Sequence, residues 1–138
     1  MARTPFAVEV LTPEGEVWSG EVEMISTRTT DGSIGLLANH APLLARLEPT
    51  ELRLYTSDEE IVRYAQAEGY MQMDDNRALL LIEEAIEPAK LDRDALASRI
   101  QQATDAAAAA PAGSEELARA KRDARRAEAF LAVATGQD

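Results

Sequence analysis

The pattern of residues changes at Pro88, and this change limits the folds open to the chain more than any other feature. Before Pro88, apolar residues tend to alternate with polar ones, and turn-forming residues interrupt them, as in a sandwich or barrel of short strands. After it, 17 of the 50 residues are alanine and β-branched residues are almost absent, which favours helix. The sequence predicts an α+β, mainly β protein, with a β-sandwich over residues 1–87 and an antiparallel two-helix hairpin over residues 88–138.

Alternating segments before Pro88 predict strands, and the Pro, Gly, Asp and Asn residues between them predict turns. The predicted turns are residues 12–15, 31–32, 57–60 and 74–76. The predicted strands are residues 6–11, 22–27, 34–37, 52–55, 61–65, 69–73 and 78–82. The last four of these strands form two predicted hairpins.

Capping residues set the expected bounds of the two helices. Asp92 is a predicted N-cap, and the first helix should end near Ala110, because Pro111 and Gly113 follow it. Ser114 is the predicted N-cap of the second helix.

Each predicted helix carries a narrow apolar stripe made largely of small residues. The stripes are Leu96, Ile100, Ala103 and Ala107 on the first helix, and Leu117, Ala120, Ala124, Ala127 and Leu131 on the second. Such stripes bury little apolar area, at about 0.8 kcal/mol per methyl-sized group. We therefore expect the hairpin to open, dock or swing away from the sandwich.

Charge and composition exclude several classes of function. The chain up to Pro88 has 17 acidic and 6 basic side chains, which should repel nucleic acid and anionic lipid. Its apolar runs are too short to cross a bilayer, so we expect a soluble, cytoplasmic protein. Cysteine is absent, which removes thiolate metal sites and thiol nucleophiles.

The pattern of polar residues favours neither a catalytic nor a metal site. His40 is the one histidine, and it has no carboxylate at ligand spacing, so we interpret it as a structural or interface residue. The adjacent acids at 74–75 and 83–84 point to opposite faces of a strand and do not converge as an acid/base pair. The phosphate-binding pattern GxxxxGK[ST] is also absent.

A basic cluster on the second helix has two interpretations. Arg119, Arg122 and Arg126 follow one another at spacings of three and four, which places them on one ridge. The ridge is either a solvated face partly paired with Asp123 and Glu128, or a docking surface for an acidic partner.

Several motifs, in their order and spacing, carry a family resemblance over essentially the whole chain. They are TPEG at residues 12–15, SGE at 19–21, DGSIG at 31–35 and NHAPLL at 39–44. Together they resemble the epsilon subunit of bacterial and chloroplast F-type ATP synthases.

The resemblance implies a ten-stranded β-sandwich that binds the gamma subunit above the membrane c-ring. The loop from Asp31 to Ile34 is implied to face the ring and the His40 region to lie toward gamma. That family often has a carboxylate where this chain has Ser33, and Asp31 is the alternative source of charge. The implied function is that of a non-catalytic rotor subunit of a proton-translocating ATP synthase, peripheral to the cytoplasmic face of the bacterial inner membrane.

The tail resembles an inhibitory hairpin that extends along gamma and sets its basic side chains against the beta subunit. Some members also bind ATP in the folded hairpin, through a pattern of Ile or Leu, Asp, two variable residues, Arg and Ala. Leu91 and Asp92 match that pattern, but Ala95 replaces the Arg, and Arg93 or Arg99 is the alternative cation. We therefore expect no cofactor beyond weak ATP binding, with Leu91, Asp92 and Arg99 as the candidate residues.

Two other functions stay open from the sequence. One is a small hydrolase that uses surface carboxylates, which would need convergent acids in a cleft. The other is an adaptor whose sandwich and hairpin bind different proteins outside any rotary machine.

Overall fold

A computed structural model describes residues 3–57 and 59–136. In these residues it contains ten strands, a short 3₁₀ helix and two α-helices. The strands are β1 (Phe6–Thr12), β2 (Gly15–Val22), β3 (Met24–Thr29), β4 (Gly32–Leu36), β5 (Leu43–Leu47), β6 (Thr50–Tyr55), β7 (Ile61–Gln66), β8 (Gly69–Asp74), β9 (Arg77–Ile82) and β10 (Ala85–Ile86). The helices are η1 (Pro88–Lys90), α1 (Arg93–Ala109) and α2 (Glu115–Ala134).

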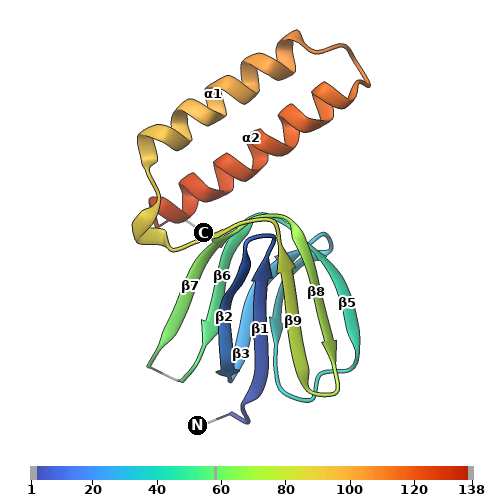
Figure 1. Cartoon of the computed structure of the whole chain (residues 1–138), viewed down its shortest axis with the longest axis vertical. Coiled ribbons are helices and arrows are strands. Elements are labelled where there is room, and N and C mark those ends of the chain that lie inside the picture. Colours follow the sequence, from blue (N-terminus) through green and yellow to red (C-terminus); the bar gives the residue numbers. More distant parts are fainter. Residues whose placement is uncertain (1–2, 58, 137–138) are drawn as a thin grey trace.

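The strands form one continuous sheet that folds on itself into two layers (Figure 1). Its order is β10-β7-β6-β3-β5-β8-β9-β1-β2, and β4 lies off this path, paired with residues Ile25 to Thr29 of β3. A single residue pair, Thr29 with Leu47, joins β3 to β5 and connects the layers. Neighbouring strands are antiparallel except β1 and β9, which are parallel. The predicted fold class is confirmed.

The inner faces of the two layers enclose the main core. Alternate residues of each strand point inward, as Phe6, Val8 and Val10 of β1 do, and all three are buried. The core is completed by residues of eight further strands, β2 to β9: Val22, Ile25, Leu36, Leu47, Leu52, Leu54, Tyr64, Met71, Met73, Ala78, Leu80 and Ile82.

The helices begin and end where the capping residues predicted. The Asp92 carboxylate accepts a hydrogen bond from the backbone N–H of Ala95 at 3.1 Å, and the Ser114 hydroxyl accepts one from that of Leu117 at 3.1 Å. The connection between the helices contains Gly113 with a φ of +74°, a backbone conformation that favours glycine.

The hairpin packs across one end of the sandwich, with α2 nearer to the strands than α1 (Figure 1). A second core lies at this junction. Phe130 and Ala127 of α2 are fully buried against Ala65 and Ala67, and Leu96 of α1 closes the core. The predicted small-residue stripes are present, but Phe130, which lies outside the predicted stripe, provides the largest side chain of this contact.

Three strands escaped prediction, and one predicted strand was misplaced. Residues 22–27 divide between the last residue of β2 and the first four of β3, because the chain turns at Glu23. Strand β2 is an edge strand rich in Glu, Gly and Ser, so it lacks strong alternation. Strands β5 and β10 have five and two residues, too few to show a period.

The boundary between the last strand and the helical tail matches the change in composition. Strand β10 ends at Ile86, and η1 begins at Pro88. Because the boundary is clean, we expect residues 1–87 to fold without the tail. In the part of the chain that the structure describes, no helix is both long and apolar enough to span a membrane.

Candidate functional site

The outward face of β5, β8 and β9 exposes large apolar side chains, and it is the strongest candidate for a binding surface. Leu44 is 72% exposed, Tyr70 49% and Leu81 47%. Tyr70 lies opposite Leu81 in the β8–β9 ladder, and Leu79 continues the outward row of β9 beside them. We call Leu44, Tyr70, Leu79 and Leu81 the apolar sheet face. Exposed large apolar side chains gathered on one face of a sheet are typical of protein–protein contacts.

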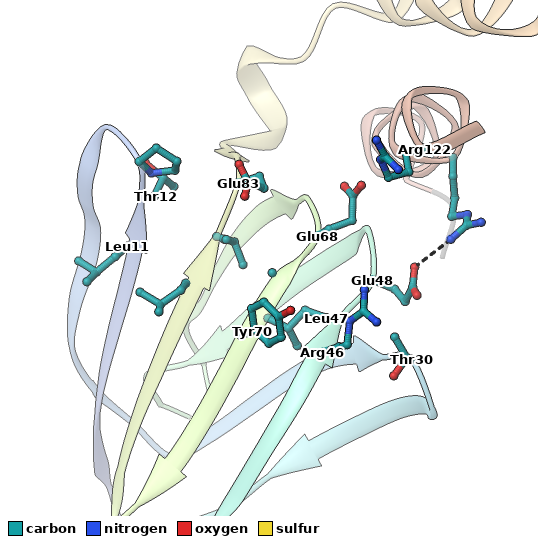
Figure 2. Close-up of a pocket in the computed structure, with 15 residues that line it drawn as sticks. Leu11, Thr12, Thr30, Arg46, Leu47, Glu48, Glu68, Tyr70, Glu83 and Arg122 are labelled. Carbon is teal, nitrogen blue, oxygen red and sulfur yellow. Dashed lines mark ion pairs between the residues drawn. The ribbon is translucent and has the colours of Figure 1, made fainter. Parts of the chain in front are cut away.

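At the hairpin end, the apolar sheet face leads into a cavity of about 480 Å³ beneath α2 (Figure 2). Tyr70, Leu81 and Leu11 form its apolar side, and carboxylates and guanidinium groups form the rest. The charged lining residues are Arg46, Glu48, Glu68, Glu83, Arg122 and Arg125. Acids and bases here are mixed, and among the described residues no group of three or more His, Cys, Asp or Glu side chains is arranged to bind a metal.

The structure divides the predicted basic ridge between the sandwich and solvent. Arg126 Nε donates to Glu68 Oε1 at 2.9 Å, which ties α2 to the β7–β8 connection. Arg122 instead pairs with Glu115 of its own helix at 3.1 Å, and Arg119 is exposed. These ion pairs differ from the proposed pairing with Asp123 and Glu128, because the helix turns Arg126 toward the sandwich.

One further arginine, which was not part of the predicted ridge, also reaches the sandwich. Arg125 Nη1 lies 3.5 Å from Glu48 Oε2 in the β5–β6 connection, the contact marked by the dashed line in Figure 2. Two consecutive residues of α2 therefore contact carboxylates on two different loops.

The predicted ring-facing and gamma-facing residues lie at opposite ends of β4. Asp31 is exposed in the β3–β4 turn, where its backbone N–H donates to Thr29 Oγ1 at 3.1 Å. Ser33 lines a cavity of about 300 Å³ between the sandwich and α2. His40 follows β4 at the other end, and its Nδ1 lies 2.7 Å from the carbonyl oxygen of Ala41.

The loop that carries His40 is fixed by a contact between two turns. The backbone N–H of Asn39 donates to Asn76 Oδ1 of the β8–β9 turn at 2.7 Å. Both residues have positive φ, which Asn tolerates better than most residues. His40 therefore occupies a structured, exposed loop, as the interface interpretation requires.

The nucleotide candidates meet near the start of α1, where some of their groups already have partners. The carboxylate of Asp92 caps α1, and Leu91 packs against the second core. Arg93 donates to the carbonyl oxygen of Ala134 at 3.1 Å, so it caps the end of α2. Arg99 is exposed on α1.

Sequence reasoning did not single out the apolar sheet face, Glu48 or Glu68. A signal for the face was present in residues 78–82, where five consecutive apolar residues make both sides of a strand apolar. The two glutamates carried no such signal, because their role depends on where α2 packs.

The sandwich region matches a known family model. Residues 5–88 match the β-sandwich domain of the ATP synthase delta/epsilon chain.

Relatives extend the match to the tail. The chain is 35% identical to the chloroplastic ATP synthase epsilon chain of Adiantum capillus-veneris over 91% of this chain and 94% of the relative. It is 33% identical to the epsilon chain of Rhodospirillum rubrum over 93% of this chain and 95% of the relative. The match to the epsilon chain of Persephonella marina is 39% identical but covers 63% of this chain and 64% of that one.

Solved structures share the fold at low identity. A chain of the Euglena gracilis mitochondrial ATP synthase OSCP/F1/c-ring assembly matches with a TM-score of 0.78 and 18% identity, over 93% of this chain and 80% of that chain. A chain of the Tetrahymena thermophila mitochondrial ATP synthase central stalk/c-ring matches with a TM-score of 0.62 and 14% identity, over 97% of this chain and 99% of that chain. The family model and the relatives confirm the predicted family: the chain belongs to the ATP synthase delta/epsilon chain family, and the relatives named here are epsilon chains.

Proposed function

We propose that this chain is a central-stalk subunit that couples the gamma subunit to the c-ring of a proton-translocating ATP synthase. It would act at the cytoplasmic face of the bacterial inner membrane, as a peripheral protein. Support comes from the family and from the similarity in fold to chains of a central stalk/c-ring and an F1/c-ring assembly.

The proposal rests on the apolar sheet face, which we assign as the binding surface for the gamma subunit. Leu44, the most exposed of its residues, lies four positions after His40, so the face is continuous with the loop expected to lie toward gamma. Burial of such leucines against a partner contributes about 25 cal/mol per Å² of apolar area removed from water. The Asp31 turn lies at the other end of β4, which leaves it free for a second partner, the c-ring.

Binding of purified gamma subunit tests this assignment. The double variant Leu44→Gln/Leu81→Gln should weaken binding roughly tenfold or more, because it places two polar amides in the centre of the interface. Ala97→Gln, on the exposed surface of α1, is the matched control and should bind as the parent does. Equal affinities for parent and double variant would reject the apolar sheet face as the gamma site.

The helical tail is proposed to inhibit ATP hydrolysis by docking its arginines on an acidic segment of the beta subunit. In a reconstituted complex, the triple variant Arg119→Ala/Arg122→Ala/Arg126→Ala should raise hydrolysis, and the effect should shrink at high salt. Alanine preserves helix, so the change removes charge without melting α2. If removal of residues 88–138 raises hydrolysis but the triple variant does not, the tail acts sterically.

A further inference from the structure

We propose that Glu48 and Glu68 form an electrostatic latch that holds α2 on the sandwich and withholds its arginines from an acidic partner. The latch is the pair of contacts Arg126 to Glu68, at 2.9 Å, and Arg125 to Glu48, at 3.5 Å. The inference that opening the latch strengthens inhibition rests on the proposed inhibitory role of the tail. The latch itself does not.

Hydrogen bonds within the sandwich hold the backbones of both glutamates in place. The N–H of Glu48 donates to the carbonyl oxygen of Arg28 at 3.0 Å, and its own carbonyl oxygen accepts from Gln66 Nε2 at 2.9 Å. Gln66 is fully buried, and Thr27 Oγ1 donates to its Oε1 at 2.7 Å. The Glu48 backbone is therefore anchored to a buried polar network.

The Glu68 backbone is anchored to the neighbouring strand connection. Its carbonyl oxygen accepts a hydrogen bond from the N–H of Glu83 at 2.9 Å. Because both loop backbones are fixed before α2 arrives, the sandwich has only the two Glu side chains to order when the latch closes, which lowers the entropic cost.

The latch lies beside the apolar contact that seats the helix. Ala127 follows Arg126 directly, and Phe130 lies one turn further along α2, where both are fully buried. Salt screens the partly exposed ion pairs and weakens them, whereas it does not weaken the apolar contact by screening. The side chains of Arg126 and Glu68 are 24% and 27% exposed, so the pair is weak enough to open.

The same guanidinium groups cannot serve the sandwich and an acidic partner at once. A partner that binds Arg125 and Arg126 binds the open hairpin more tightly than the closed one. It therefore shifts the population toward the open state. Neutralising the sandwich carboxylates should do the same while leaving every α2 arginine intact. The expected effect on hydrolysis is thus opposite in sign to that of removing the arginines.

Spin labels on the isolated full chain measure the latch without any partner. The chain has no cysteine, so Ser19→Cys in β2 and Ser98→Cys in α1, both exposed, give one label pair across the junction. Glu48→Gln/Glu68→Gln should raise the ratio of open to closed hairpin about two- to thirtyfold, for two partly exposed pairs. Salt should open the parent more than this variant.

Two comparisons make that measurement decisive. Glu21→Gln/Glu59→Gln changes the net charge equally at exposed positions of β2 and the β6–β7 turn, and it should leave the distance distribution unchanged. Glu68→Arg should open the hairpin, and adding Arg126→Glu should close it again. Unchanged distances in Glu48→Gln/Glu68→Gln, or failure of the reversed pair to close, would overturn the latch.

Hydrolysis by the reconstituted complex then separates the latch from the proposed function. Glu48→Gln/Glu68→Gln should lower hydrolysis below that of the parent complex, and the Glu21/Glu59 control should not. If the labels report opening but hydrolysis stays constant, the latch stands and the inhibitory docking of the arginines is wrong. If neither measurement changes, the latch itself is wrong.

Discussion

At Gly69, the first residue of β8, the fold leaves no room for a side chain. A Cβ added there would overlap the carbonyl oxygen of Leu81 and lie 2.7 Å from the Cα of Ile82. Both atoms belong to the β9 backbone, which cannot move without disturbing the β8–β9 ladder. The glycine is therefore required by the close approach of two strands and by nothing in the local turn.

Replacing Gly69 by alanine should destabilise the sandwich strongly. We expect the melting temperature to fall by roughly 10 °C, since overpacking against fixed backbone costs about 1–3 kcal/mol or more. Gly35→Ala in β4 is the matched control, because its added Cβ meets no atom closer than the sulfur of Met24 at 3.6 Å. Thermal unfolding followed by circular dichroism compares the two, and equal melting temperatures would contradict the steric account.

Tyr64, in the main core, should make the folded state less stable at alkaline pH. Burial, and secondarily the charge of Glu87, raises the pKa of the Tyr64 phenol above its usual value of 10.0. Because the folded state holds this proton more tightly than the unfolded state, its contribution to stability is complete below the unfolded pKa. That contribution is lost as the pH rises through the folded pKa.

The variant Tyr64→Phe isolates this effect. Denaturant unfolding measured between pH 8 and pH 11.5 should show a smaller alkaline loss of stability in the variant than in the parent. If both proteins lose stability in parallel over this range, the phenol does not titrate as its burial requires.

Among the helices and strands, the features predicted correctly were those that depend on residues close together in the sequence. Asp92 and Ser114 cap helices through bonds to residues three positions away, so their roles can be predicted without knowledge of the tertiary structure. Strand β5 escaped prediction because its five residues are defined by pairing with β8, which is distant in sequence. The orientation of α2 could not be predicted for a similar reason. Phe130 lies outside the alanine stripe, and it packs α2 against β7.

Phe130 should hold the hairpin on the sandwich more than any single ion pair does. Phe130→Ala removes a fully buried ring, a change that typically costs about 3–5 kcal/mol in a protein core. Amide hydrogen exchange should show faster exchange in α1 and α2, with the amides of β8 and β9 unchanged.

A second variant of the same helix serves as its control. Leu117→Ala lies near the start of α2, is half-buried and lies outside the second core, so it should loosen the hairpin less. Exchange that accelerates equally throughout the sandwich in Phe130→Ala would mean that the two cores unfold as one.

For the whole molecule, the two-part organisation could be predicted, but the use of its surfaces could not. The spacing of Arg119, Arg122 and Arg126 predicts one ridge on a helix, yet spacing does not reveal that Arg126 turns toward Glu68. Asp31 and His40 are nine positions apart in the sequence, and the intervening strand β4 sends them to opposite ends of the sandwich. These relations depend on packing between parts that are distant along the chain.

Ion pumping by a reconstituted complex tests the central claim, that this chain couples gamma to the c-ring, most directly. The measurement is ATP-driven pumping per ATP hydrolysed in vesicles whose ATP synthase lacks its epsilon chain. Adding the full chain should restore coupling, and residues 1–87 should also restore it while leaving hydrolysis faster. Leu44→Gln/Leu81→Gln should restore it poorly at the same concentration. If the full chain leaves the ratio of pumping to hydrolysis unchanged, the chain is not the coupling subunit proposed here.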